Sequence, residues 1–128
     1  MAKKILVVDD DRGLVALLRA KLKAHGYLVC VSYNGKTALE KVKKETPDLI
    51  ILDVMMPKVN GFTVCSVLKS DEAYKAIPIV ILTGRHQDND REFDENVRPN
   101  AFFTKPFSPK ELLDAIKQLM NQKQLVLS

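Results

Sequence analysis

Residues 4–11 read KILVVDDD, a short apolar run that ends in three consecutive aspartates. The apolar part has the length and the Ile, Val and Leu content of a β-strand. Similar runs follow along the chain and predict five strands, over residues 4–8, 28–32, 49–52, 79–82 and 101–104. Three of the runs are almost continuously apolar instead of alternating. This pattern indicates strands that are buried on both faces, and therefore a parallel sheet between two helix layers.

The stretches between these runs have the patterns of helices. Leucines recur at helical spacing through 14–22, and Gly26 stands where a left-handed C-cap would end that helix. Asn34 and Ser108 are candidate N-caps for later helices, and Gly61 is expected to permit a turn before the third helix. Parallel strands need crossover connections, which the helices supply. The sequence therefore predicts one α/β domain of the form (βα)5, with a doubly wound sheet of five parallel strands.

Composition is that of a globular protein and argues against several functions. Of the 128 residues, 46% are hydrophobic and 28% are charged, and the formal net charge is +4. The lysines are not interleaved with aromatic residues, so we expect solvated helix faces and no direct nucleic-acid binding. No apolar run is long enough to span a bilayer and no secretory signal pattern is present, so we expect no membrane association and a cytoplasmic location. Cys30 and Cys65 lie far apart in apolar runs, which favours two small buried side chains.

Polar residues follow four of the five predicted strands. Residues 9–11 are all aspartate, Asp53 follows the third strand, Thr83 the fourth and Lys105 the fifth. In a doubly wound sheet these strand ends meet at one edge, where ligands bind. Each aspartate alone could cap a helix, and this is our interpretation of Asp11. Together, however, the carboxylates repel one another unless a cation neutralises them. The set therefore favours Mg²⁺ with a phosphate oxygen, for which Lys105 supplies a charge and Thr83 a hydrogen-bond donor.

The chain closely resembles the receiver domain of two-component response regulators. Four motifs carry the resemblance, in order and at the family's spacing: ILVVDDD at 5–11, LIILDVMMPKVNG at 49–61, ILTG at 81–84 and FFTKPF at 102–107. The resemblance covers residues 3 to about 120. It implies a flavodoxin-like fold with the strand order 2-1-3-4-5.

The resemblance also implies a phosphoacceptor and a metal site. Asp53 would accept the phosphoryl group. Asp10, Asp53 and the backbone carbonyl of Met55 would bind Mg²⁺ directly, or Mn²⁺ in its place, and Asp9 would act through a bound water.

A second set of residues would hold the phosphoryl group and transmit the signal. By the same resemblance, Thr83, Lys105 and the backbone N–H of Gly84 would hold the phosphoryl oxygens. The Lys105–Pro106 peptide bond is expected to be cis, which an X–Pro bond permits at low cost. Phe102 stands at the family's switch-aromatic position and would swing inward when Thr83 moves toward the phosphoryl group. A plain core role for Phe102 is an equal alternative.

The function that the resemblance implies is a switch, not an enzyme. A sensor histidine kinase or a phosphotransfer protein would donate the phosphoryl group, and an output domain or a partner protein would respond. Two alternatives remain. An interaction domain that works without phosphate would not need the retained acidic and basic residues. A phosphohydrolase would need a second acid two residues after the nucleophile, where Met55 stands.

Residues 1–122 are predicted to form the receiver domain, and 123–128 a tail or the start of a linker. Whether the chain is a complete single-domain regulator or the receiver of a longer protein stays open. The segment 85–100 departs from the family pattern because it holds few apolar residues, and we expect at most a short helix within 89–97. In the family this region belongs to the face through which many receivers dimerise. We therefore expect a monomer, with a dimer on phosphorylation left open.

Overall fold

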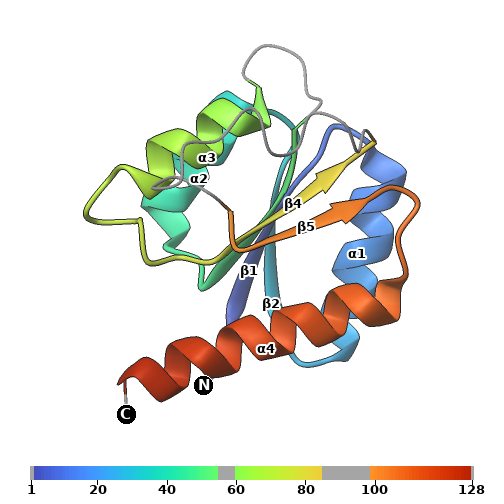
Figure 1. The fold of residues 1–128 in the computed structure, drawn as a ribbon. Helices are drawn as coiled ribbons and strands as arrows, with labels where there is room; N and C mark the ends of the chain where they lie inside the picture. The colour runs from blue at the N-terminus through green and yellow to red at the C-terminus, as the bar shows by residue number, and fades with distance from the viewer. Residues whose placement is uncertain (1, 55–59, 85–98, 128) are drawn as a thin grey trace.

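The computed structural model describes residues 2–54, 60–84 and 99–127 (Figure 1). Five strands and four helices lie in these ranges, and each predicted strand is present, with the third and fourth one residue longer than expected. Met55, predicted as a metal ligand, and residues 89–97, predicted to hold at most a short helix, lie outside the described residues. The strands are β1 Lys4–Val8, β2 Leu28–Ser32, β3 Leu49–Asp53, β4 Ile79–Thr83 and β5 Ala101–Thr104, and the helices are α1 Arg12–Ala24, α2 Gly35–Glu45, α3 Gly61–Lys69 and α4 Pro109–Leu127.

All five strands form one parallel sheet. Its order is β2-β1-β3-β4-β5, as the resemblance to receiver domains implies. The chain starts in the middle of the sheet, builds outward to β2, returns across β1 to β3 and continues to β5 at the other edge. The strand order therefore reverses beside β1 and β3, and this is where a doubly wound sheet binds its ligand.

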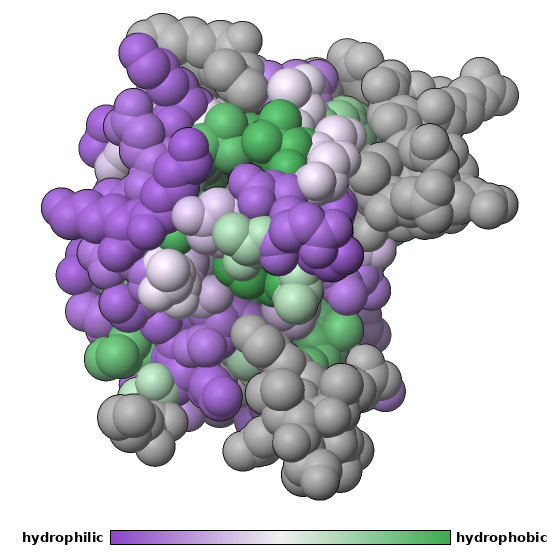
Figure 2. Space-filling view, turned by 90° about the vertical axis from the view of Figure 1, so that its left-hand side faces the viewer, coloured by the Kyte–Doolittle hydropathy of each residue, from purple (hydrophilic) through white to green (hydrophobic). Residues whose placement is uncertain are grey.

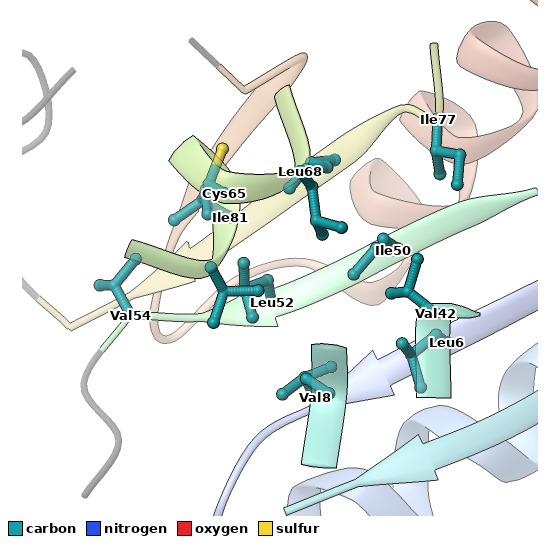
Figure 3. Close-up of a cluster of buried hydrophobic side chains, with 13 residues drawn as sticks. Leu6, Val8, Val42, Ile50, Leu52, Val54, Cys65, Leu68, Ile77 and Ile81 are labelled. Carbon is teal, nitrogen blue, oxygen red and sulfur yellow. The ribbon is translucent and has the colours of Figure 1, made fainter. Parts of the chain in front are cut away.

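The sheet separates two apolar clusters, because successive residues of a strand point to opposite faces. Leu6 and Val8 of β1 join the cluster with α2 and α3, part of which Figure 3 shows. Ile5 and Val7 of the same strand join the cluster with α1 and α4. All four side chains are fully buried. Burial on both faces explains why β1 reads as a continuous apolar run in the sequence.

The helix ends confirm the predicted capping residues. The Asp11 side chain accepts a hydrogen bond from the Leu14 N–H (3.1 Å) at the start of α1, and Asn34 and Ser108 cap α2 and α4 in the same way. Gly26, with φ +89°, follows the end of α1, where the N–H of Tyr27 bonds the carbonyl of Leu22. This is the pairing of a Schellman motif, which a residue in the left-handed region completes.

The surface differs from the interior in the expected way. The face seen in Figure 2 is mostly hydrophilic, with apolar side chains gathered in smaller patches. Cys65 is buried as expected, whereas Cys30 is only half-buried because β2 is an edge strand, and both are free thiols. Within the described ranges, no helix is long and apolar enough to cross a membrane. Helix α4 runs to Leu127, through the predicted domain end at 122, so that this boundary stays a prediction.

Candidate functional site

The carboxyl ends of β1 and β3 bring three aspartates together. Asp9 directly follows β1 and Asp53 is the last residue of β3, and their side chains are almost completely buried. Carboxylate oxygens of Asp9, Asp10 and Asp53 all lie within 4.8 Å of one another, and Asp10 is the exposed member. The structure therefore brings together the three acidic residues that the sequence predicted to meet.

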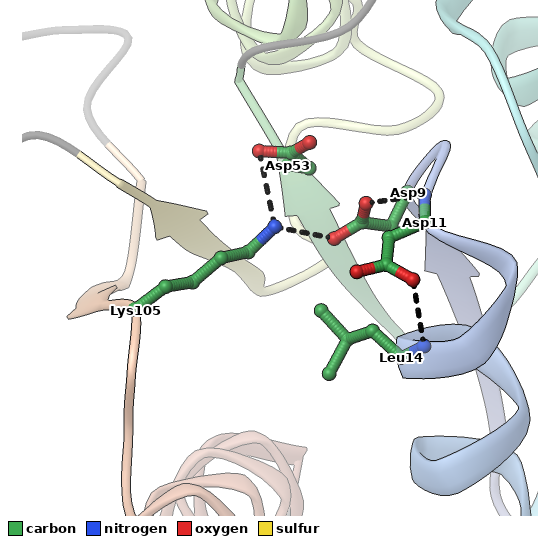
Figure 4. Close-up of polar contacts among 5 residues, drawn as sticks. All are labelled: Asp9, Asp11, Leu14, Asp53 and Lys105. Atoms are coloured by element: carbon green, nitrogen blue, oxygen red, sulfur yellow. Dashed lines mark hydrogen bonds and ion pairs between the residues drawn. The ribbon is translucent and has the colours of Figure 1, made fainter.

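Asp9 is held from both sides. Its Oδ1 accepts a hydrogen bond from the N–H of Asp11 (2.9 Å), and its Oδ2 lies 2.8 Å from the Nζ of Lys105 (Figure 4). Its own N–H donates to the carbonyl of Ser32 at the end of β2 (3.2 Å). Because each carboxylate oxygen has a partner, the buried charge is offset by a cation and by a main-chain donor.

Asp11 is separate from the acidic cluster in function. Its side chain turns to the N-terminus of α1, where it accepts the bond from Leu14 (Figure 4). The helix end is electropositive, so the Asp11 charge is favourable there. This geometry confirms the interpretation of Asp11 as a cap.

Lys105 reaches the cluster from the end of β5, which is an edge strand of the sheet. It follows β5, and its N–H donates to the carbonyl of Thr83 (2.7 Å), so that the residue extends the β4–β5 ladder by one bond. Its Nζ also lies 3.7 Å from the Oδ1 of Asp53. Burial by itself would lower the Lys105 pKa, but the hydrogen bond to Asp9 and the nearby Asp53 outweigh it and raise the pKa. The Lys105–Pro106 peptide bond is cis, as expected.

The electrostatics of the site favour a divalent cation. Three carboxylates face one ammonium among the described residues, so the cluster retains excess negative charge. Two of the carboxylates are buried, where an uncompensated charge is expensive. Oxygen ligands from carboxylates at this spacing suit a hard cation such as Mg²⁺. The described residues of the acidic cluster can therefore hold a metal ion.

Of the remaining predicted residues, Thr83 and Gly84 lie at the carboxyl ends of the strands, and Phe102 lies within β5. Thr83 is the buried last residue of β4, and the exposed Gly84 follows it directly. Phe102, in β5, pairs with Ile81 across the ladder and is half-buried against the cluster with α2 and α3. This placement fits both the switch role and the core role that the sequence left open.

Gly61 has a different role from the one expected. It is the first residue of α3 and not part of a turn before it, and the helix is capped by Asn60, whose side chain accepts from the N–H of Phe62 (2.6 Å). A Cβ on Gly61 would overlap the carbonyl oxygen of Asp53 and lie 2.6 Å from the Cα of Val54. The glycine is needed because α3 starts in contact with the end of β3. The sequence contains the residue but no pattern that reveals this close approach.

Comparison with known proteins agrees with this geometry. Residues 5–117 match the family described as the response regulator receiver domain. The chain is 38% identical over 125 residues to the alkaline phosphatase synthesis transcriptional regulatory protein PhoP of Bacillus subtilis, covering 98% of this chain and 51% of that protein. It is 40% identical over 126 residues to the response regulator PleD of Caulobacter vibrioides, covering 98% of this chain and 28% of that protein. The chain thus spans about half or less of the length of these relatives.

Solved structures extend the likeness to the fold. The chemotaxis response regulator CheY4 of Vibrio cholerae has a TM-score of 0.84 at 31% identity, covering 93% of this chain and 99% of that one. The receiver domain of a sensor histidine kinase of Pseudomonas aeruginosa PAO1 has a TM-score of 0.84 at 25% identity, covering 94% of this chain and 99% of that one. That receiver domain holds a magnesium ion in its active site cleft. Together with the strand order and the acidic cluster, these matches show that the chain belongs to the response regulator receiver domain family.

Proposed function

We propose that Asp53 is the residue through which this receiver domain accepts its phosphoryl group. The observation that carries the proposal is the position of its buried carboxylate, 3.7 Å from the Lys105 ammonium and grouped with the carboxylates of Asp9 and Asp10. Of the three acids, Asp10 is exposed, and Asp9 is engaged by Lys105 at the shorter distance of 2.8 Å. Asp53 is therefore the buried carboxylate that lies farther from the Lys105 ammonium.

The reaction needs positioning and charge compensation more than a strong nucleophile. A carboxylate oxygen of Asp53 forms a bond to phosphorus, and the bond between phosphorus and the imidazole nitrogen of a donor phosphohistidine breaks, so that the nitrogen keeps the electron pair. Lys105 offsets negative charge on the phosphoryl oxygens, and Thr83 and the N–H of Gly84 donate hydrogen bonds to them. The product is an acyl phosphate, which water can later hydrolyse, as a reversible signal requires.

The acidic cluster would hold Mg²⁺ through Asp10 and Asp53 directly and through Asp9 by way of a bound water, with the backbone carbonyl of Met55 as a further ligand. When bound, the ion would supply positive charge beside the transferred phosphoryl group. Mn²⁺ would serve in its place, because it takes similar oxygen ligands. Support for Mg²⁺ comes from the excess of carboxylates over cations in the described site.

The proposed output is a change on the face that includes β5. Thr83 would move toward the phosphoryl group, and the half-buried ring of Phe102 would follow into the vacated space. A sensor histidine kinase or a phosphotransfer protein would be the donor, and an output domain or a separate protein would respond. A monomer before phosphorylation and a cytoplasmic location remain predictions.

Mass spectrometry of the intact protein tests the assignment. With acetyl phosphate and Mg²⁺, the wild-type chain should gain the mass of one phosphoryl group, and Asp53→Asn should gain none while remaining folded. Asp11→Asn is the matched control, because Asp11 is an aspartate that caps α1 away from the cluster, and it should be phosphorylated like the wild type. Uptake by Asp53→Asn at the wild-type rate would overturn the assignment, and no uptake by the wild type would favour an interaction domain that works without phosphate.

A further inference from the structure

Strand β4 ends in Thr83 and strand β5 leads directly into Lys105, but the sequences of these strands specify their pairing register weakly. Strand β4 reads IVILT and is buried throughout, and β5 reads AFFT and is half-buried at the edge of the sheet (Figure 1). A slip of one residue normally exposes the apolar face of a strand, which is how burial fixes register. In two continuously apolar strands a slip mostly exchanges one apolar side chain for another. Something else must set the register.

A polar residue directly before β5 supplies this restraint. The N–H of Asn100 donates to the carbonyl of Ile79 (2.8 Å), and the N–H of Ile79 donates to the Oδ1 of Asn100 (2.9 Å). Asn100 therefore contacts both main-chain groups of the first residue of β4. The other end of the same ladder is the bond from the N–H of Lys105 to the carbonyl of Thr83 (2.7 Å). The Lys105 bond continues the ladder that pairs Val80 with Ala101 through Thr83 with Thr104, whereas the Asn100 bond lies one residue out of step with that ladder and so fixes where β5 begins on β4.

Lys69, the last residue of α3, fixes the side chain of Asn100. Its Nζ donates to the Oδ1 of Asn100 (2.8 Å) and to the carbonyls of Ile77 (3.0 Å) and Lys75 (3.3 Å). An ammonium has three donors, so these bonds satisfy it completely. The three acceptors are neutral oxygens, and burial is the main reason why the pKa of Lys69 is lowered. A half-buried cation that bonds neutral oxygens is better suited to holding main-chain groups in place than to pairing with a charge.

We propose that Lys69 and Asn100 are positioning residues that set the register of β5 on β4 and thereby place Lys105 beside Asp9 and Asp53. A slip of one residue would move Lys105 by about 3.3 Å along the strand and turn its side chain to the other face of the sheet. Lys69 acts through Asn100, and neither residue touches the acidic cluster in the described contacts. The inference rests on the proposed role of Lys105 in phosphoryl transfer.

Two measurements distinguish positioning from general stability. The aspartates lie at the ends of β1 and β3, so a slip of β5 should not weaken Mg²⁺ binding, whereas phosphoryl transfer needs Thr83 and Lys105 in place. In Lys69→Met and Asn100→Ala, the rate of phosphorylation by acetyl phosphate should fall about tenfold or more, as small misplacements of reacting groups do. The dissociation constant for Mg²⁺ should remain within about twofold of the wild type or decrease.

Matched variants complete the design. Lys75→Met removes a lysine from the segment between α3 and β4. The Lys75 side chain forms an exposed ion pair with Glu72 (2.8 Å), so this variant should leave the phosphorylation rate unchanged. Asn100→Asp keeps an oxygen for both Lys69 and the N–H of Ile79, so it should restore most of the rate. Amide hydrogen exchange adds a readout without phosphate, in which Lys69→Met and Asn100→Ala should selectively lose protection at the N–H of Lys105.

The results separate this inference from the proposed function. If the wild type were not phosphorylated, the proposed function would be wrong, but the exchange measurement would still test the register of β5 on β4. A wild-type rate and wild-type protection in Lys69→Met would overturn the inference, even if Asn100→Ala failed to fold. A parallel loss of Mg²⁺ affinity, or an Asn100→Asp variant as slow as Asn100→Ala, would also overturn it.

Discussion

The ammonium of Lys105 lies 2.8 Å from the Oδ2 of Asp9 but 3.7 Å from the Oδ1 of Asp53. Lys105 is therefore paired mainly with the fully buried Asp9 and only loosely with the proposed phosphoacceptor. A cation in this position competes with a metal ion for the same carboxylates. It is also close enough to Asp53 to approach a phosphoryl group attached there.

Replacement of Lys105 with Ala should leave Mg²⁺ binding intact or make it tighter. The change removes a positive charge that neutralises Asp9, and because Lys105 is partly exposed we expect a gain on the order of 1 kcal/mol, about fivefold in the dissociation constant. The same variant should respond weakly to phosphorylation, because the link between the phosphoryl group and β5 is lost. Calorimetric titration with Mg²⁺ measures the first effect, and a clear loss of affinity would contradict it.

Replacement of Gly61 with Ala should destabilise the domain although alanine is the better helix former. The new Cβ would overlap main-chain atoms of Asp53 and Val54, and these belong to or adjoin a central strand that cannot easily move. Overpacking of this kind costs about 1–3 kcal/mol or more in the free energy of unfolding. Urea denaturation of both proteins measures the difference.

Gly13→Ala is the matched control for Gly61→Ala. Gly13 also lies in the first turn of a helix, α1, and its Cβ would come no closer than 3.4 Å to the Asp11 side chain. Alanine should therefore leave stability unchanged or raise it by up to about 1 kcal/mol. Equal effects of the two substitutions would show that the contact between α3 and β3 is not the cause.

The contrast between Asp53 and Gly61 explains which features the sequence predicts. The strand that ends at Asp53 can be predicted from the sequence because a polar residue directly follows an apolar run. The parallel topology then brings the ends of the strands together. The role of Gly61 depends on how closely α3 approaches β3, a distance that no local pattern records. In the same way, Asp11 and Asn34 act within a few residues of their position and could be recognised as caps.

Lys69 and Asn100 show the same limit more clearly. They are 31 residues apart in the chain, and each is an ordinary polar residue, one at the end of α3 and the other directly before β5. Their interaction appears only when α3, β4 and β5 are assembled. Charge on Lys69 would suggest a solvated helix end, but the folded chain surrounds its ammonium with three oxygens.

Replacement of Thr46 with Gly should stabilise the domain. Thr46 ends α2 with φ 43° and ψ 64°, in the left-handed region that a β-branched residue adopts only with strain. Glycine removes the strain but increases the freedom of the unfolded chain, so we expect a net gain of about 0.5–1 kcal/mol. The thermal midpoint should rise by a few degrees.

Ser70→Gly is the control for Thr46→Gly. Ser70 caps α3 with φ −92° and ψ −5°, which any residue adopts readily. Glycine there removes no strain and only increases the freedom of the unfolded chain, so stability should fall slightly. If Thr46→Gly lowered the midpoint as well, the left-handed cap would not be the source of strain.

Stability at alkaline pH should depend on the thiol of Cys65. The side chain is fully buried on α3, and burial is the main reason why its pKa is raised from 9.0 to about 11. Between these values the folded state keeps the thiol proton while the unfolded chain releases it, so unfolding becomes more favourable as pH rises. The loss should reach on the order of 2 kcal/mol near pH 11.

Cys65→Ala lacks this group, and although its cavity lowers stability at every pH, its deficit relative to the wild type should shrink between pH 9 and 11. Cys30→Ala provides the comparison, because Cys30 is only half-buried and should contribute a smaller slope. Urea denaturation of the three proteins at pH 8, 9 and 10 measures these slopes, and parallel curves for the wild type and Cys65→Ala would show that the folded domain does not suppress ionisation of this thiol.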